Sequence, residues 1–146
     1  MIVLEAHMDV TVVEALDESQ IDQLVALYRN EFWCKHRQRA GVVKMLIHSD
    51  VVIGVVDVSN NLLGFARVLS DFTYKAIIFD VIVHPDWRDR GIGALLMNTV
   101  INHPGLKDIE HFDLNCLPEM HAFYKRWGFT AEVGELSFMR RFNREF

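Results

Sequence analysis

The sequence predicts an α/β (α+β) fold in which helices pack on a mixed, mostly antiparallel central sheet. Its size supports this: 146 residues, 51% of them hydrophobic, suffice for one core and are too few for two. We therefore expect a single domain over residues 1–146. The order of the predicted elements is β, α, α, β, β, β, α, β, α, β, β, which places a three-strand meander before a βαβ unit. That order corresponds to about six to seven strands flanked by about four helices.

The first half of the chain predicts a strand, two helices and a hairpin. The strand covers residues 9–16. Helix-capping residues and helical spacing of apolar residues indicate a helix over 17–32, and a second helix is expected over 37–47. Apolar runs at 51–58 and 62–69 flank a short Ser-Asn-Asn turn, which predicts that they pair as a hairpin.

The second half alternates strands and helices and ends in two further strands. In chain order these are a strand at 75–83, a helix at 90–103, a strand at 108–115, a short helix at 118–127 and closing strands at 128–133 and 136–141. The helix at 90–103 stops before Pro104-Gly105, where a helix cannot easily continue.

The junction between the strand at 75–83 and the following helix is rich in glycine and arginine. It runs Arg88-Asp89-Arg90-Gly91-Ile92-Gly93-Ala94. Glycine lets a backbone approach a ligand closely, and the first turn of a helix offers unpaired N–H groups to an anion. The junction lacks the Gly-Lys-Ser/Thr of a Walker loop, and a dinucleotide fingerprint would need a third glycine where Leu96 stands. We therefore interpret it as a phosphate cradle, with an ordinary glycine-containing turn as the alternative.

Composition excludes several function classes. The net charge of −5 argues against general nucleic-acid binding and weakly favours a cationic substrate. Two cysteines are too few for a disulfide framework, and no histidines pair at a recognised metal-ligand spacing, so we expect no metal. Residues 1–5 do not resemble a signal peptide, and no apolar run approaches the length of a membrane helix. We therefore expect a cytoplasmic protein without membrane or nucleic-acid partners.

Two motifs within this element order resemble the GNAT superfamily of N-acetyltransferases, in particular its small, bacterial-type, single-domain members. The first is Arg88-x-x-Gly91-x-Gly93, and the second is Ala122-Phe123-Tyr124-Lys125-Arg126-Trp127-Gly128-Phe129, which is similar to the late helix of that family. Residues 64–85 also resemble a branch of small bacterial GNAT proteins and plant serotonin N-acetyltransferases. The resemblance implies the GNAT fold over nearly the whole chain.

The resemblance also implies acetyl transfer from acetyl-CoA, as co-substrate, to a primary amine by direct attack in a ternary complex. In that family the strand corresponding to 75–83 splays from its neighbour and pairs with the pantetheine arm, while a backbone N–H near Val81 holds the oxyanion. Asp89 departs from the small or basic residue usual at its position. The implied CoA-binding residues are Val81, Ile82, Val83, Arg88, Asp89, Arg90, Gly91, Ile92, Gly93, Ala94, Asn115 and Tyr124.

Tyr124 is the candidate general acid, because a phenol within reach of the sulfur can protonate the leaving thiolate. The alternative is an aromatic core residue. Asp80 is the best-placed candidate base, although alternation along the strand could turn it away from the thioester. Other candidates for the base are Asp71, Glu119, His121 and His84. Asn115 either forms a hydrogen bond with the pantetheine arm or caps the end of its strand.

Aromatic residues fall in the segments that border the acceptor pocket of this family. They are Phe32, Trp33, Phe72 and Tyr74, with His36 and Arg37 in the same segments. They favour a small amine with an apolar or aromatic body, unless Phe32 and Trp33 only pack the first helix on the sheet. The acceptor itself stays open among an arylalkylamine, a polyamine, an amino acid, an antibiotic amine and a protein lysine.

Two alternative functions share the fold. One is a non-catalytic CoA-binding module that acts as a sensor or docking unit, and the other is an acyltransferase that uses a longer acyl-CoA. An acyl-cysteine route through Cys34 or Cys116 lacks a Cys/His signature, and free cysteines are commonly buried and inert. GNAT proteins are often dimers, so the resemblance makes a homodimer one candidate state.

Overall fold

The computed structural model describes residues 9–145, which form two compact units. The first unit ends at Leu114 and the second begins at Asn115. Residues 1–5, interpreted above as lacking a signal peptide, lie outside the described residues. The expectation of a single domain stays a prediction.

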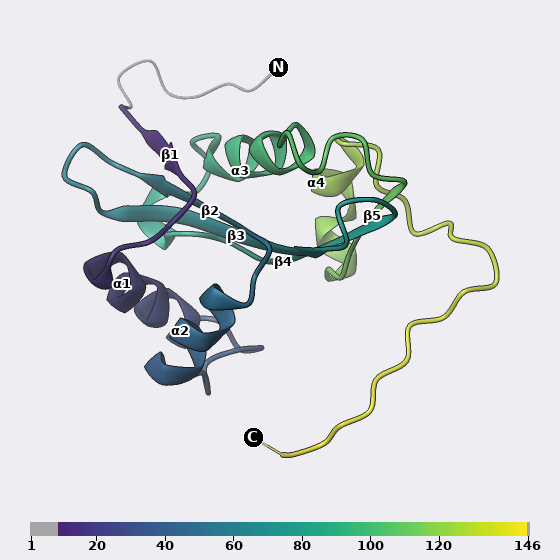
Figure 1. Cartoon of the computed structure of the whole chain (residues 1–146), viewed down its shortest axis with the longest axis horizontal. Helices are drawn as coiled ribbons and strands as arrows, with labels where there is room; N and C mark the ends of the chain where they lie inside the picture. Colours follow the sequence, from purple (N-terminus) through teal and green to yellow (C-terminus); the bar gives the residue numbers. More distant parts are fainter. Residues whose placement is uncertain (1–8, 146) are drawn as a thin grey trace. The chain divides into compact units, whose positions relative to one another are not determined.

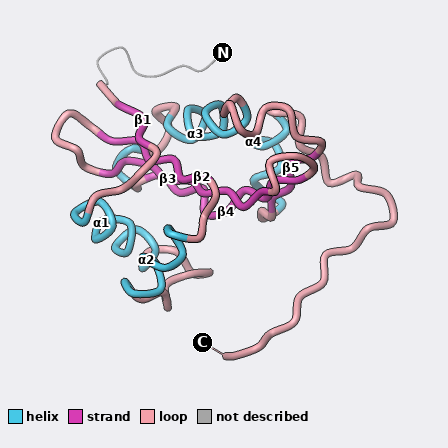
Figure 2. The backbone as a smooth tube through the Cα atoms, viewed as in Figure 1, coloured by secondary structure: helices cyan, strands magenta, loops and turns pink. Residues whose placement is uncertain are grey.

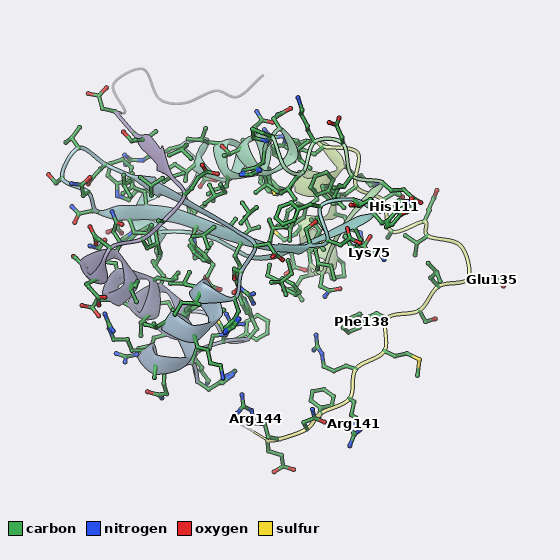
Figure 3. The ribbon with its side chains drawn as sticks, viewed as in Figure 1. Lys75, His111, Glu135, Phe138, Arg141 and Arg144 are labelled. Atoms are coloured by element: carbon green, nitrogen blue, oxygen red, sulfur yellow. The ribbon has the colours of Figure 1, made fainter. Side chains whose placement is uncertain are left out.

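The first unit is built on one five-stranded sheet in the order β1-β2-β3-β4-β5 (Figure 1). Its pairings are antiparallel except for the parallel pair of β4 and β5, which starts with Lys75 beside His111 (Figure 3). The sheet is therefore mixed and mostly antiparallel, as predicted. The strands are β1 (Thr11–Val13), β2 (Val51–Val56), β3 (Leu62–Ser70), β4 (Lys75–Val83) and β5 (His111–Leu114).

Helices cover both faces of this sheet. α1 (Glu18–Arg29) and α2 (Arg39–Ile47) lie on one face and α3 (Ile92–Ile101) on the other (Figure 1). α1 starts at a capping box in which Asp17 and Gln20 exchange hydrogen bonds, which satisfies backbone donors that have no partner within the helix. The core under α1 contains Leu24, Tyr28 and Phe65, all fully buried.

Close packing of α3 depends on Gly64 in β3. A Cβ atom at Gly64 would lie 2.7 Å from Cγ2 of Ile92 and 3.2 Å from Cδ1 of Leu96. The missing side chain therefore lets the first turns of α3 rest directly on the sheet. This contact positions the start of α3 next to the end of β4.

The second unit contains the short helices η2 (Pro118–Met120) and α4 (His121–Lys125). Tyr124 packs edge-on against Phe123 and Phe129, with ring centroids 5.0 and 6.1 Å away. The short helix predicted over 118–127 is thus present in two pieces.

The predicted closing strands at 128–133 and 136–141 do not form; these residues are loops and turns (Figure 2). Figure 3 shows Glu135, Phe138 and Arg141 spaced along this backbone. Phe138 is 66% exposed, and Gly128 and Gly134 adopt positive φ angles that interrupt extended structure. A strand needs a hydrogen-bonded partner, which alternation of side chains alone does not supply. The described sheet therefore has five strands rather than six to seven, while the predicted fold class is confirmed.

Candidate active site

β4 separates from β5 partway along its length. The two strands pair only from Lys75 with His111 to Ile78 with Leu114. Beyond Ile78, β4 continues to Val83 with no partner on this side among the strands described between residues 9 and 145. The backbone groups along this stretch of edge are therefore open to an extended ligand.

A β-bulge lies in β4 at the same point. On the opposite side, Phe65 of β3 pairs with Ile82 and Arg67 pairs with Phe79. Ala66 therefore faces two residues of β4, Asp80 and Val81. Asp80 adopts a φ of +57°, a left-handed conformation that is uncommon for residues other than glycine. Bulges re-aim backbone and side-chain groups, and this one lies where the free edge of β4 begins.

The side chain of Asp80 is the hub of a buried polar cluster. Its Oδ2 atom accepts hydrogen bonds from the Tyr28 hydroxyl at 2.9 Å, from Arg37 Nη1 at 2.7 Å and from Arg67 Nε at 2.7 Å. The three donors come from α1, the segment between α1 and α2, and β3. The Asp80 side chain is only 4% exposed, so this network ties the helical layer to the bulge.

The cluster keeps Asp80 ionised and its neighbours protonated. Burial opposes ionisation of the Asp80 carboxyl, but the hydrogen bond from Arg37 and the charge of Arg67 outweigh it and hold the pKa below its usual range. Burial and the Asp80 charge raise the pKa of Tyr28 far above its ordinary value. Asp80 is therefore a poor proton acceptor near neutral pH.

Arg37 is held by aromatic rings as well as by Asp80. Its guanidinium carbon lies 4.7 Å from the centroid of the Tyr28 ring and 5.6 Å from that of Trp33. Trp33 packs edge-on to Tyr28 and is 38% exposed, whereas Phe32 is 71% exposed. The Trp33 ring therefore lies at the border of the cluster with part of its surface exposed, and Phe32 projects towards solvent.

Phe72 and Tyr74 lie at the opposite end of β4. Phe72 packs beside Gly105, where an added Cβ would lie 3.2 Å from its ring, and Tyr74 is 65% exposed. A strand rises about 3.3 Å per residue, so the Tyr74 and Asp80 Cα atoms are separated by about 20 Å. The described contacts thus bring Trp33 to the bulge but do not bring Phe72 and Tyr74 there.

The predicted phosphate cradle follows β4 and a single turn, η1 (Pro85–Trp87). Gly91 adopts a φ of +88° at the N-cap of α3, and no side chain caps this helix start. The first bond of the helix runs from the Leu95 N–H to the Gly91 carbonyl, so the preceding N–H groups of the first turn have no helical acceptor. This arrangement offers donors to an anion.

The charged residues of the cradle are held to different degrees. Arg88 donates from Nε to the Val83 carbonyl and lies 3.4 Å from a Glu31 oxygen, so it folds back towards the end of β4. The Arg90 guanidinium carbon lies 4.8 Å from the centroid of the Trp87 ring. Asp89 is exposed at a φ of +61°.

The second unit holds Asn115 and Tyr124. Asn115 is exposed at the start of the unit, and Tyr124 is largely buried in α4. Burial and the nearby Cys116 raise the pKa of the Tyr124 hydroxyl to about 12. The hydroxyl therefore carries its proton at neutral pH, as a general acid requires. Glu119 is exposed in η2, and His121 opens α4.

Two of the other base candidates have structural partners. The Asp71 carboxylate accepts the N–H groups of Thr73, Tyr74 and Lys75, and these bonds lower its pKa. His84 accepts the Asp86 N–H at Nδ1 and so caps η1. Both arrangements are typical of turn and cap residues.

Neither cysteine environment favours an acyl-cysteine route. Cys34 is fully buried, and burial raises the pKa of its thiol to about 12. Burial, with Glu119 next, also raises the pKa of the Cys116 thiol. A protonated thiol is a weak nucleophile.

A cavity of about 350 Å³ lies beside η1, outside the Asp80 cluster. It is lined by Gln23, Ala26, Leu27, Asn30, Asp57, Asn61, Leu62, Leu63, His84, Asp86 and Trp87. The Asp57 carboxylate already accepts the N–H groups of Ser59 and Asn61. None of the cluster residues lines this cavity.

Among residues 9–145, no group of three or more His, Cys, Asp or Glu residues is arranged to hold a metal ion. None of the helices in the same range is long and apolar enough to cross a membrane.

A sequence model of the acetyltransferase (GNAT) domain matches residues 47–131, more than half of the chain. The chain belongs to the GNAT family. The matched region includes β4, its bulge and the Gly91 turn. The GNAT fold predicted from the element order and the two motifs is therefore confirmed.

Individual relatives agree with this assignment. The uncharacterized N-acetyltransferase ycf52 of Porphyra purpurea is 36% identical over 90 residues, which is 60% of this chain and 52% of that protein. GCN5-related N-acetyltransferase 1, chloroplastic, of Arabidopsis thaliana is 30% identical over 97 residues, 66% of this chain and 49% of that protein. The chain thus covers about half the length of these curated relatives. A crystal structure assigned to the GNAT family from Xanthomonas campestris pv. campestris has a TM-score of 0.78 and 34% identity, covering 92% of this chain and 93% of that one.

Sequence analysis of this GNAT protein missed two residues of the cluster, Tyr28 and Arg67. Arg67 lies within the segment 64–85 that carries part of the resemblance, and Tyr28 lies within the helix predicted over 17–32. A usable signal was present: Arg67 and Asp80 are charges of opposite sign in the interior of two apolar strands that were predicted to be neighbours, whereas Lys75 stands at the end of its strand. Buried charges are almost always paired, so each indicated the other.

Proposed function

We propose that this protein transfers an acetyl group from acetyl-CoA to a primary amine of a small molecule by direct attack in a ternary complex. One observation carries the proposal: a strand with a bulge and a free edge runs into a helix start whose N–H groups have no cap. An extended thioester arm and a pyrophosphate need these two features next to each other, in this order.

The first unit supplies the edge of β4 and the start of α3 as binding groups for CoA. The pantetheine arm pairs with the free edge of Val81–Val83 in the manner of an added strand. The pyrophosphate lies on the first-turn N–H groups of α3, with Arg88 and Arg90 beside it. Asp89 is exposed, so its carboxylate has room to turn away from the phosphates.

The chemical step forms a C–N bond and breaks a C–S bond. The neutral amine attacks the thioester carbonyl, and the Val81 N–H at the bulge holds the oxyanion. The Tyr124 hydroxyl, whose pKa is raised to about 12, gives its proton to the departing sulfur of CoA. Asn115 holds the pantetheine arm or an ordered water by a hydrogen bond.

In this proposal the ammonium form of the amine gives one proton to water before the attack. Asp80, expected from sequence to be the base, has a lowered pKa and three hydrogen bonds on one oxygen, which makes it a weak proton acceptor. Its role is to position the bulge, because its side chain ties residue 80 to α1 and β3. As the C–S bond breaks, the nitrogen loses a second proton, which returns through water to the Tyr124 oxygen.

Release of free thiol tests the proposal. The protein is incubated with a broad amine panel and either acetyl-CoA or butyryl-CoA, and a thermal-shift series with CoA alone is run in parallel. Amine-dependent thiol release together with CoA protection supports the transferase. Protection without release from any acyl-CoA supports the alternative of a sensor or docking module. Release from butyryl-CoA but not from acetyl-CoA supports the longer-chain acyltransferase, and absence of both protection and release overturns all three.

Compartment and assembly stay predictions. The sequence predicts a cytoplasmic protein, and two relatives from Arabidopsis thaliana carry the name chloroplastic. The homodimer that is frequent in the family is tested by light scattering of the purified chain.

A further inference from the structure

The polar cluster around Asp80 carries more positive than negative charge. Two guanidinium groups, Arg37 and Arg67, share one carboxylate, and their side chains are only 26% and 12% exposed. Glu31 is engaged with Arg88, and the neighbouring Tyr28 and Cys34 are neutral because burial raises their pKa values. A surplus of one positive charge is thus held in a half-buried place, where it attracts anions more strongly than it would in open solvent.

Most of the donors on these two arginines are not used. Arg67 donates to Asp80 through Nε, and Arg37 donates to Asp80 and to the Met45 sulfur through Nη1. The other guanidinium nitrogens of both residues have no hydrogen-bond partner among residues 9–145. No side-chain nitrogen or oxygen in that part of the chain is both sealed from solvent and unsatisfied. These nitrogens are therefore reachable from solvent, and a ligand can approach them.

The unused donors lie close to the proposed reaction point. Asp80, to which both arginines bind, directly precedes Val81, and consecutive Cα atoms are about 3.8 Å apart. The guanidinium groups are therefore within roughly 10 Å of the Val81 N–H. That separation suits a small acceptor whose amine meets the thioester while another group reaches the arginines. The half-exposed ring of Trp33 packs against Arg37 in the same cluster.

We propose that the acceptor is a primary amine that also carries an oxyanion, a carboxylate or a phosphate, and that Arg37 and Arg67 bind this group. Guanidinium groups present their N–H donors in a planar fork that matches the oxygens of both anions. Tyr28 and Trp33 hold Arg37 in place, so little side-chain freedom is lost on binding. This inference rests on the proposed function, because it names the class of acceptor for the same site.

The test compares amines that differ mainly in the anionic group. The pairs are 4-aminobutyrate against butylamine, 4-(2-aminoethyl)benzoate against 2-phenylethylamine, and O-phosphoethanolamine against propylamine. We expect kcat/KM with acetyl-CoA to be about 10-fold or more higher for the anionic member of at least one pair, mainly through KM. The first two pairs report a carboxylate and the third a phosphate. The preference is the kcat/KM of the anionic amine divided by that of its neutral partner. A preference of one or less in all three pairs overturns the proposal.

Arginine variants assign the preference to the cluster. Arg37→Gln and Arg67→Lys should bring the preference of the best pair towards one, since each removes part of the planar donor set. A general loss of activity lowers kcat/KM for both amines of a pair by the same factor, so the ratio of the two values is unaffected by it. Arg39→Gln is the matched control, because Arg39 lies two residues from Arg37 but pairs with Glu18 and Asp22 on the surface. A preference that survives both cluster variants overturns the assignment.

A binding measurement separates this inference from the proposed function. The same pairs are titrated calorimetrically into the protein saturated with CoA. If no amine releases thiol but the anionic member still binds about 10-fold more tightly, and Arg37→Gln removes the difference, the transferase fails and the oxyanion site stands. If thiol is released without any difference within the pairs, the transferase stands and the oxyanion site fails.

Discussion

At the scale of single residues, Asp80 connects the conformation of the backbone to the charges around it. A left-handed φ costs an L-residue about 1–2 kcal/mol, and such strain persists only where the surroundings enforce it. Here the three hydrogen bonds on Oδ2 enforce it, because they hold the side chain from three separate elements. The bulge at Val81 therefore depends on residues that are far away in the sequence.

Asp80→Asn should destabilise the fold by about 3–5 kcal/mol at pH 7, because two guanidinium groups lose their buried counter-charge. Asparagine tolerates a left-handed φ, so the loss reports charge rather than backbone strain. Urea unfolding measures it, with Asp113→Asn as control. Asp113 pairs with Lys75 at 3.0 Å, but both side chains are more than half exposed, and we expect a change of about 0.5 kcal/mol or less.

The same variant has a defined pH dependence. The folded-state pKa of Asp80 is below its ordinary value of 3.8, so the stabilisation is complete above that pH and is lost as the pH falls towards the folded-state value. The stability gap between the natural chain and Asp80→Asn should therefore be constant from pH 5 to 7 and narrow below about pH 4. A gap that widens on acidification would contradict this assignment.

Trp33→Ala should cost only about 1 kcal/mol, well below the roughly 3–5 kcal/mol of a buried tryptophan. The reason is that the ring is 38% exposed and borders the Arg37 cluster rather than filling the core. We expect KM for the best amine to rise while CoA protection persists. A strongly destabilised protein with an unchanged KM would mean that Trp33 serves packing alone.

Tyr124→Phe should lower kcat by about 100-fold or more while CoA affinity stays nearly unchanged. The variant removes only the hydroxyl and keeps the ring contacts with Phe123 and Phe129. Steady-state kinetics and a CoA thermal shift measure the two effects. An unaltered kcat would show that another group protonates the thiolate.

At the scale of elements, the pairing of β4 with β5 over only four register positions leaves half of β4 open. The bulge, η1 and the Gly91 start of α3 then follow within a few residues. Gly64 keeps the first turns of α3 against the sheet, so the helix start is held in place relative to the free edge.

Gly91→Glu should abolish thermal protection by CoA in a protein that still folds. The new carboxylate would repel the phosphates, and its side chain would occupy the place where they approach the backbone. Gly134→Glu is the matched control, since Gly134 shares a positive φ with Gly91, has no atom of residues 9–145 outside its chain neighbours within 4 Å of an added Cβ, and lies far along the chain in the second unit. Full protection of folded Gly91→Glu would remove the phosphate-cradle assignment.

At the scale of the whole molecule, the ionisable groups of the site predict how turnover depends on pH. Tyr124 stays protonated and Asp80 stays ionised between pH 6 and 9, given the directions of their pKa shifts. The amine, with a pKa near 10, is then the group that titrates. We expect kcat/KM to rise about 10-fold per pH unit across this range. A plateau below pH 8 would reveal a protein base that the proposal does not contain.

The sequence by itself determined the fold class, the positions of the helices and sheet strands to within a few residues, and the glycine turn at Gly91. These features are local, because hydrophobic spacing, caps and the need for a positive φ are written in neighbouring residues. The tertiary structure decided the Asp80 cluster, whose partners lie 52, 43 and 13 residues away along the chain. It also decided that residues 128–141 form no strands, because a strand exists only where another backbone accepts its hydrogen bonds.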